Sequence, residues 1–278
     1  MIINEHFPSA PLNTYINALR YCEGPTPYRH LKEVPTPALN LMINFNDVYH
    51  CYRAENAKPY LTCAESWSIG LWNRHHVLDW PRNMQLFIVD FKPGGAYPFL
   101  HLPLSELHNE ILPMDTIWGN LAAEIRERLY SAPTLHARFV LLEQLLLDRL
   151  EEIPDGLSAV QSALVQIDQH HGSLSIRDLA EEVGMSHNHL IRQFQRLVGG
   201  TPKEVARIYR FKYTLSNLAR TEPIDWSEVA RQAHYYDQSH FNKDFKAFTG
   251  HTPTDFLRLH REVHIDHPTL PPNFLPTG

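Results

Sequence analysis

The chain has little cysteine and no long apolar run, and both absences limit what it can be. Cys22, Cys51 and Cys63 are the only cysteines among 278 residues, an odd number without the close spacing of a disulfide framework or a zinc site. No apolar stretch approaches the roughly 18 residues of a membrane-spanning helix. The opening residues, MIINEHFPSAP, lack the apolar core of a secretory signal. We therefore expect a protein of the reducing cytoplasm with no membrane partner.

The short motifs of catalysis are also missing. The sequence contains no glycine-rich phosphate loop and no nucleophile elbow, and its Ser, His and Asp residues fall into no local signature. His75 and His76 are adjacent, so on a strand they would face opposite sides. His101 and His108 are seven residues apart without a third ligand at a suitable spacing. These observations predict no catalytic residue, no bound metal and no cofactor.

Positive charge is scarce, and it is unevenly distributed. The formal net charge is −6. Residues 1–156 carry 12 Lys and Arg against 18 Asp and Glu, whereas residues 157–262 carry 13 against 12. The C-terminal part is less acidic but hardly basic, so its attraction to phosphate backbones should be modest. Binding to nucleic acid would then depend on individually placed contacts and on a second subunit.

The length suggests two domains, and the first half follows a strand pattern. Residues 1–114 contain apolar and polar alternation in LNLMINFN, which begins at Leu39. MQLFIVDF, residues 84–91, is apolar on both faces, as expected of a strand buried between two layers. The pattern predicts a small all-β sandwich or barrel.

Residues 115–153 are predicted to form a helical pair, with the second helix following Pro133. The second helix has apolar residues at spacings of three and four: Leu135, Phe139, Leu142, Leu146, Leu150 and Ile153. Leu141 and Leu145 widen this face. Packing on the protein's own β-domain and self-association both fit such a face. Residues 154–156, Pro-Asp-Gly, end the pattern and mark the domain boundary.

One pattern then occurs twice, in residues 173–198 and 224–248. Ala180 of the first copy recurs 50 positions later as Ala230, and the residues beyond the turn recur 51 positions later. Each copy reads as helix, tight turn, helix. The helix starts are marked by capping side chains, which are Ser175, Ser186, Asp225 and Asp237. Gly184 supplies the left-handed residue that the first turn requires.

The second helix of each copy has an apolar stripe and a polar face. The stripes are Leu190, Phe194 and Leu197 in one copy and Phe241, Phe245 and Phe248 in the other. The polar faces contain the side chains that we predict to contact DNA: His187, Asn188, Ile191, Arg192, Gln195, Gln238, Ser239, Asn242, Lys243 and Lys246. Amide, basic and hydroxyl groups there can pair with base edges in a major groove. A single solvated helix face would look similar, but two copies favour DNA binding.

Between the copies, Thr201, Pro202 and Glu204 open a helix that is predicted to run to about Ala219. Such a helix is roughly 27 Å long, and successive major-groove faces lie about 34 Å apart. One rod of this length can hold both reading helices on one side of a duplex.

Residues 157–262 resemble the DNA-binding domain of the AraC/XylS family of bacterial transcription regulators. The resemblance is most specific at 230–253, ARQAHYYDQSHFNKDFKAFTGHTP. It implies that the base-reading positions are Asn188, Ile191, Arg192, Gln238, Ser239, Asn242 and Lys243. Ile191 can only contact a thymine methyl or fill space. His234 stands where the family usually has Gly, so a left-handed turn there would carry some strain.

The whole chain resembles the layout of AraC-type regulators, an α+β fold of two domains. The N-terminal domain is expected to be a cupin-like β-barrel or sandwich, with the helical pair following it. Residues 91–100, FKPGGAYPFL, resemble a strand end in some members. The resemblance implies a bacterial cytoplasmic homodimer that binds double-stranded DNA, RNA polymerase and an unknown small effector, as an activator or a repressor. Residues 263–278 are rich in proline and are predicted to form a flexible tail.

A pocket for the effector is suggested by Trp67, Trp72, Arg74 and Trp80, with Arg74 placed to meet an acid. Tryptophans close in sequence are more often part of a core. Two alternatives remain open from the residues alone. One is a metal-dependent cupin enzyme joined to a DNA-binding domain, and the other is a DNA-binding protein that responds to no effector.

Overall fold

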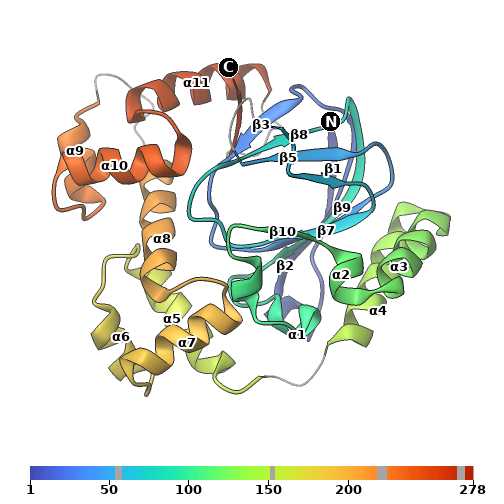
Figure 1. The fold of residues 1–278 in the computed structure, drawn as a ribbon, viewed down its shortest axis with the longest axis horizontal. Coiled ribbons are helices and arrows are strands. Elements are labelled where there is room, and N and C mark those ends of the chain that lie inside the picture. The colour runs from blue at the N-terminus through green and yellow to red at the C-terminus, as the bar shows by residue number, and fades with distance from the viewer. Residues whose placement is uncertain (54–57, 151–153, 218–223, 268–272, 278) are drawn as a thin grey trace.

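The computed structural model describes residues 1–53, 58–150, 154–217, 224–267 and 273–277. Figure 1 shows a β-rich half beside a column of helices. The strands are β1 (Ile2–His6), β2 (Ile16–Pro25), β3 (His30–Glu33), β4 (Asn40–Asn44), β5 (Tyr49–Tyr52), β6 (Leu61–Cys63), β7 (Ser66–Ile69), β8 (His76–Asp79), β9 (Asn83–Phe91), β10 (Ile111–Pro113) and β11 (Phe274–Pro276). Two short 3-10 helices, η1 (Leu12–Thr14) and η2 (Leu104–Leu107), lie between strands.

The described strands form two facing sheets, which confirms the predicted β-sandwich or barrel. One sheet has the order β1-β2-β9-β4-β7-β10 and the other has the order β11-β3-β8-β5-β6. The central strand β9 is buried on both faces, as its sequence predicts. Phe87 and Val89 belong to the core shared with the helices, whereas Met84 and Leu86 belong to the core between the sheets.

The C-terminal residues do not all form the flexible tail that their prolines suggested. Strand β11 pairs with β3 in antiparallel register, with Phe274 opposite Glu33. Leu275 is fully buried, and Phe274 is 8% exposed. The prediction of a flexible tail over 263–278 is therefore wrong for this segment. Its two apolar side chains gain a buried position, and Pro276 is tolerated because β11 lies at the edge of its sheet.

The region 114–150 contains three helices where a pair was predicted. They are α2 (Met114–Trp118), α3 (Asn120–Ser131) and α4 (Leu135–Arg149), and a shorter helix, α1 (Tyr97–Leu100), precedes them. Gly119, with φ of 58°, separates α2 from α3. The apolar stripe of α4 packs on its own β-domain, where the Phe139 and Phe87 rings lie 5.2 Å apart. Ile153, predicted to extend the stripe, lies outside the described residues.

The C-terminal half is helical, as predicted. Its helices are α5 (Leu157–Gln169), α6 (Ile176–Glu182), α7 (His187–Leu197), α8 (Pro202–Ser216), α9 (Trp226–Gln232), α10 (Gln238–Thr249) and α11 (Pro253–Asp266). Figure 1 shows α8 as a rod, with α6 and α7 near one end and α9 and α10 near the other. None of the helices in the described ranges has both the length and the apolar character needed to cross a membrane.

Both helical units contact the β-rich half. At the first unit, His108 Nδ1 lies 2.8 Å from the Gly199 carbonyl oxygen, and Asn73 donates a hydrogen bond of 3.0 Å to Glu204. At the second unit, Lys32 Nζ lies 2.9 Å from His251 Nε2. The helical half is thus held against the β-rich half at both ends of α8.

Candidate DNA interface and ligand cavity

The first helix-turn-helix unit consists of α6 and α7, and its sequence signals act as predicted. The Ser175 and Ser186 hydroxyls accept hydrogen bonds from backbone N–H groups three residues later, so each caps the N-terminus of a helix. Gly184 has φ of 71°, a conformation that glycine adopts without steric cost. The apolar stripe, Leu190, Phe194 and Leu197, is fully buried. Burial of this stripe leaves the opposite face of α7 turned outward.

The second unit, α9 and α10, repeats the arrangement with a different turn residue. Asp225 and Asp237 cap its two helices through their carboxylates. His234 occupies the left-handed position of the turn, with φ of 57°. A side chain with a Cβ is strained in this region, which confirms that the second turn departs from the glycine-containing one.

The rod α8 begins with the predicted capping box. The Glu204 backbone N–H donates to the Thr201 hydroxyl, and the Thr201 backbone N–H donates to the Glu204 carboxylate at 2.9 Å. The helix has 15 residues, or roughly 22 Å at the usual rise, and its C-cap is Asn217. It is shorter than predicted, and Ala219 lies outside the described residues. The distance between α7 and α10 thus depends on the angle at which each of them crosses its end of α8.

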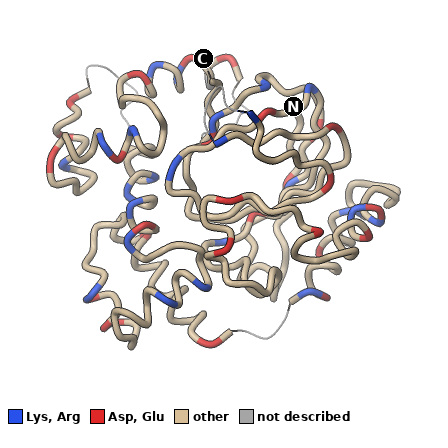
Figure 2. The backbone as a smooth tube through the Cα atoms, viewed as in Figure 1, with Lys and Arg blue, Asp and Glu red and all other residues tan. Residues whose placement is uncertain are grey.

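Nearly all the side chains predicted to contact DNA are exposed. The exposed ones are His187, Asn188, Arg192, Gln195, Gln238, Ser239, Asn242, Lys243 and Lys246. Ile191 is partly buried, as expected of an apolar side chain beside the stripe. Figure 2 shows Lys and Arg along α8 and in both units, with Asp and Glu interspersed, which fits the weak net charge of this half. His189 and His240 are also exposed on these helices and were not singled out from sequence.

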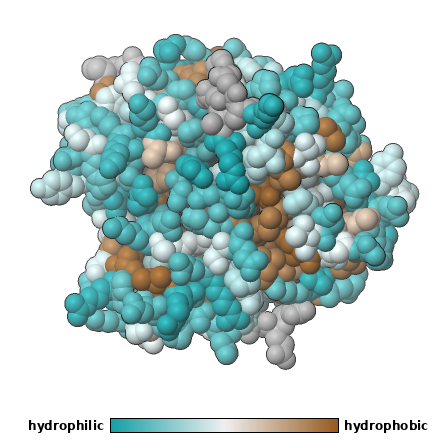
Figure 3. Space-filling view, viewed as in Figure 1, coloured by the Kyte–Doolittle hydropathy of each residue, from teal (hydrophilic) through white to brown (hydrophobic). Residues whose placement is uncertain are grey.

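A cavity of about 500 Å³ lies between the two sheets. Its lining residues are Met1, Ile3, Glu5, Arg20, Cys22, Glu33, Thr36, Ala38, Asn40, Met42, Tyr49, Trp67, Ile69, Leu78, Trp80, Met84, Leu86, Ile88, Asp90, Asn273 and Phe274. The volume is within the range of pockets that hold small metabolites. On the face drawn in Figure 3, hydrophobic residues gather over the β-rich half, whereas the region of α9 and α10 is mainly hydrophilic.

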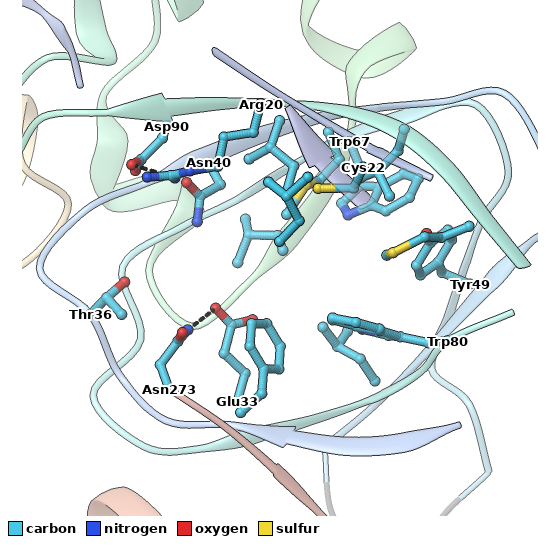
Figure 4. Close-up of a pocket in the computed structure, with 18 of the residues that line it drawn as sticks. Arg20, Cys22, Glu33, Thr36, Asn40, Tyr49, Trp67, Trp80, Asp90 and Asn273 are labelled. Atoms are coloured by element: carbon cyan, nitrogen blue, oxygen red, sulfur yellow. Dashed lines mark hydrogen bonds and ion pairs between the residues drawn. The ribbon is translucent and has the colours of Figure 1, made fainter. Parts of the chain in front are cut away.

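The cavity has a polar end and an aromatic end (Figure 4). Asn273 donates a hydrogen bond of 3.1 Å to Glu33 at the polar end. At the aromatic end, the Tyr49 and Trp67 rings lie 5.0 Å apart. The Tyr49 hydroxyl is buried and has no hydrogen-bond partner among the described residues. Such an arrangement suits a ligand with one apolar end and one polar end.

Burial changes the acid–base properties of two groups in the cavity wall. It raises the pKa of the Cys22 thiol to about 12, mainly because the thiolate would lose its hydration. Burial likewise raises the pKa of the Tyr49 hydroxyl. Both groups are therefore neutral at physiological pH, and Tyr49 is available as a hydrogen-bond donor or acceptor.

Two of the three tryptophans predicted to line a pocket do line the cavity, and the third does not. Trp67 and Trp80 line the cavity. Trp72 is buried beside it and stacks on His76, with ring centroids 4.3 Å apart. Arg74 is exposed and lies outside the lining of this cavity, so the structure does not bring it together with Trp67 and Trp80. The wall contains Arg20 instead, because alternation along β2 turns this residue toward the opposite sheet.

Sequence reasoning also missed Glu33, Asn273 and Phe274. Glu33 could have been identified from sequence, because it is a charged residue next to an apolar strand pattern and charged residues are seldom buried. No local signal identifies Asn273 and Phe274, which reach the cavity only through pairing across more than 200 residues. The histidines considered as metal ligands make other contacts: His101 Nε2 lies 2.6 Å from the Pro98 carbonyl oxygen. The described residues contain no group of three or more His, Cys, Asp or Glu side chains that could hold a metal.

Comparison with known proteins finds two domain families. Residues 179–259 match a helix-turn-helix domain family, and residues 4–113 match a domain of unknown function, DUF6597. The arabinose operon regulatory protein of Escherichia coli K12 is 32% identical over 126 residues, 42% of each chain. The Msm operon regulatory protein of Streptococcus mutans is 25% identical over 165 residues, 58% of this chain and 51% of the relative. The chain thus spans about half the length of these relatives.

Among solved structures, ToxT of Vibrio cholerae with a bound unsaturated fatty acid is similar at 13% identity, covering 88% of this chain and 95% of ToxT, with a TM-score of 0.45. The AraC-like transcriptional activator CuxR is similar at 14% identity, covering 78% of this chain and 87% of CuxR, with a TM-score of 0.27. The helix-turn-helix match falls on the two units described above, and both curated relatives regulate operons by name. Residues 179–259 thus belong to a helix-turn-helix domain family, and the similarity of the chain to two operon regulators supports the predicted resemblance to AraC-type regulators.

Proposed function

We propose that this protein is a sequence-specific DNA-binding transcription regulator that acts as a homodimer. The observation that carries the proposal is the pair of exposed polar faces on α7 and α10, one near each end of α8. Each unit inserts its polar face into a major groove, and successive grooves are read by the two units. Asn188 and Arg192 of the first face and Asn242 and Lys243 of the second have the donors and acceptors that base edges present.

The cavity between the sheets is the proposed effector site. Its volume, its two contrasting ends and the unpaired Tyr49 hydroxyl support this assignment. Effector binding shifts the equilibrium between alternative arrangements of the DNA-binding half. The size of this shift is limited by the difference in effector affinity between those arrangements. The contacts of Glu204 and His251 with the β-rich half provide a path between the two parts.

The proposed dimer face is the part of α4 that the β-domain leaves uncovered. Val140 is 50% exposed and Leu147 is 37% exposed, and the two lie two turns apart on one side of the helix. Replacing both by Glu should convert a dimer into a monomer in sedimentation velocity without changing the circular dichroism spectrum. A chain that is monomeric before the change, or dimeric after it, contradicts this face.

The DNA contacts are tested by selecting a binding site and then changing one reading residue. Footprinting of genomic fragments, with and without candidate metabolites, supplies the site. Arg192→Ala should then weaken binding to that site by about 1 to 3 kcal/mol, with a much smaller effect on random DNA, because a base contact is lost. Arg128→Ala, which removes the same charge from α3, is the control and should leave specific binding unchanged. Equal losses on both DNAs would assign Arg192 to the phosphate backbone.

A further inference from the structure

We propose that the cavity binds a small organic cation with an apolar or aromatic body, and that the C-terminal strand β11 is part of its wall. The inference rests on the proposed function, because it gives the chemical class of the effector and the route by which its binding reaches the second helix-turn-helix unit. The charge at the polar end, the aromatic end and the position of β11 carry it.

Carboxylates outnumber cations at the polar end. Of the described side chains that line the cavity, Glu5, Glu33 and Asp90 are acidic and Arg20 alone is basic. Arg20 donates hydrogen bonds of 2.7 Å to both Glu5 and Asp90, so its charge is already paired within the protein. The lining side chains therefore have a formal excess of negative charge. This excess favours a positively charged ligand and disfavours a carboxylate.

Glu33 is the anchor for the positive group. It is 5% exposed, and a carboxylate removed from water needs several donors around it. Asn273, a neutral amide, donates one hydrogen bond to Oε1, and Oε2 lies 3.1 Å from His76 Nε2. A carboxylate accepts about four hydrogen bonds. Acceptor positions on Glu33 thus remain for an ammonium or guanidinium group, which forms short charge-assisted bonds.

The other end of the cavity selects the body of the ligand. The Trp80 and Phe274 rings lie 5.0 Å apart, and Trp67 and Tyr49 continue the aromatic surface. Aromatic ring faces pack against apolar groups and also attract cations. Tyr49 is 3% exposed, and its buried hydroxyl needs a partner that the described residues do not provide. A ligand with one hydrogen-bonding atom on its apolar body supplies this partner.

Strand β11 connects the cavity to the DNA-binding half. It follows α11, the helix after the second reading helix, and contributes Phe274 to the wall, while the adjacent Asn273 contacts the proposed anchor. Lys32, which precedes Glu33 on β3, contacts His251 in the connection between α10 and α11. A ligand that pairs with Glu33 and packs on Phe274 therefore stabilises β11 in its docked position. By linkage, the docked second unit binds this ligand more tightly than an undocked one.

The ligand class is tested with three probes that share one body and differ in charge: 4-phenylbutylamine, 4-phenylbutanol and 4-phenylbutyrate. Isothermal titration of the full-length protein should rank the amine first. The amine should bind about tenfold or more tightly than the alcohol, the gain expected of one charge-assisted hydrogen bond in a buried site. The carboxylate should bind most weakly. Tightest binding of the carboxylate, or binding of none of the three up to their solubility limits, overturns the proposal.

The anchor is tested with Glu33→Gln. The glutamine oxygen still accepts the hydrogen bond from Asn273, so the variant retains the pairing of β11 with β3. It should bind the amine and the alcohol with similar affinity, while the affinity for the alcohol stays near that of the unchanged protein. Glu65→Gln, an exposed position on the same domain, is the matched control and should keep the preference for the amine. A preference that survives Glu33→Gln excludes Glu33 as the anchor.

The role of β11 is tested by hydrogen exchange. Binding of the amine should slow exchange of the backbone amides of Phe274 and Leu275, since the ligand holds the strand in place. Phe274→Ala should weaken binding of all three probes, because it removes a wall residue that contacts the shared body. Unchanged exchange at Phe274 and Leu275 in the saturated complex shows that β11 is not coupled to the ligand.

These experiments separate the ligand class from the regulator function, because none of them uses DNA. A protein that binds its selected DNA site but none of the probes is a regulator with a different effector class. A protein that binds the amine as described but shows no selective DNA binding has the proposed ligand site without the proposed function.

Discussion

Arg207 and Asp244 form a two-point ion pair that joins the second reading helix to the rod. Arg207 Nη2 donates to Oδ1 at 2.7 Å and Nε donates to Oδ2 at 3.2 Å. Asp244 is 5% exposed, and the guanidinium also lies 5.2 Å from the centre of the Phe248 ring. The angle between the polar face of α10 and the rod therefore depends on a buried electrostatic contact as well as on the phenylalanine stripe.

Arg207→Ala should lower the free energy of unfolding by about 3 kcal/mol, because it leaves the buried Asp244 charge without its partner. Arg207→Lys should cost less, since the charge is retained although the two-point geometry is lost. Urea unfolding followed by circular dichroism measures both. The control is Arg177→Ala, whose partner Glu181 is exposed, and whose loss should be below about 0.5 kcal/mol. Equal losses at the two sites would contradict this interpretation.

His234→Gly should raise the melting temperature. His234 has φ of 57°, where a Cβ costs about 1 to 2 kcal/mol and glycine costs nothing. The greater freedom of glycine in the unfolded chain offsets part of the gain, so we expect a net shift of a few degrees. Differential scanning calorimetry measures it, and an unchanged or lower value means that this turn is not strained.

The first turn offers the reverse substitution as a matched comparison. Gly184 has φ of 71°, and a Cβ built on it would meet no atom within 4 Å. Gly184→Ala should therefore lower the melting temperature through backbone strain alone, without a steric clash. A drop at Gly184 together with a rise at His234 would show that the same left-handed position limits both units.

The sequence was sufficient for features whose signals lie within one or two turns of helix. Ser186 caps α7 because its hydroxyl reaches a backbone N–H three residues away, a relation that depends on local geometry alone. The stripe Phe241, Phe245 and Phe248 is buried because its spacing matches the helical period. The two units, their turns and their outward faces could therefore be predicted without knowledge of the tertiary structure.

The cavity could not be predicted to the same extent, because its walls come from distant parts of the chain. Glu33 and Asn273 are 240 residues apart in sequence, and nothing near either residue indicates the other. The prolines around Phe274 correctly indicate that no helix continues there. They do not indicate that the edge of a distant sheet is available for pairing, so the segment was predicted to be flexible. Arg74 was selected for its neighbours in sequence, whereas Arg20 lines the cavity through strand alternation.

Glu204 should make the contact between α8 and the β-rich half sensitive to acid. Burial favours its protonated form, but hydrogen bonds from Thr201 and Asn73 outweigh this effect and hold its pKa below the ordinary value of 4.5. A carboxyl with a lowered pKa in the folded state contributes stability above its unfolded pKa. This contribution is lost as the pH falls below 4.5 and through the folded pKa.

The difference in unfolding free energy between the unchanged protein and Glu204→Gln should therefore be largest at neutral pH and shrink as the pH falls below 4.5. Urea unfolding at a series of pH values measures it. Glu124→Gln, in an exposed pair with Arg128, should give a small difference throughout. A difference that is constant with pH would show that the hydrogen bonds to Glu204 do not depend on its charge.

Cys22 should react slowly with thiol reagents although it lines the cavity between the sheets. Its pKa of about 12, against an ordinary value of 9.0, lowers the thiolate fraction near pH 8 by about a thousandfold, and the thiolate is the reactive form. In a variant with Cys51→Ala and Cys63→Ala, the rate of alkylation by iodoacetamide should rise about tenfold per pH unit to beyond pH 10. If the alkylation rate instead levels off near pH 9, the thiol reacts only after the sheets separate, because the pKa of an exposed Cys22 thiol is the ordinary 9.0. Bound 4-phenylbutylamine should slow the reaction further at every pH, since the ligand occupies the space through which the reagent reaches the sulfur.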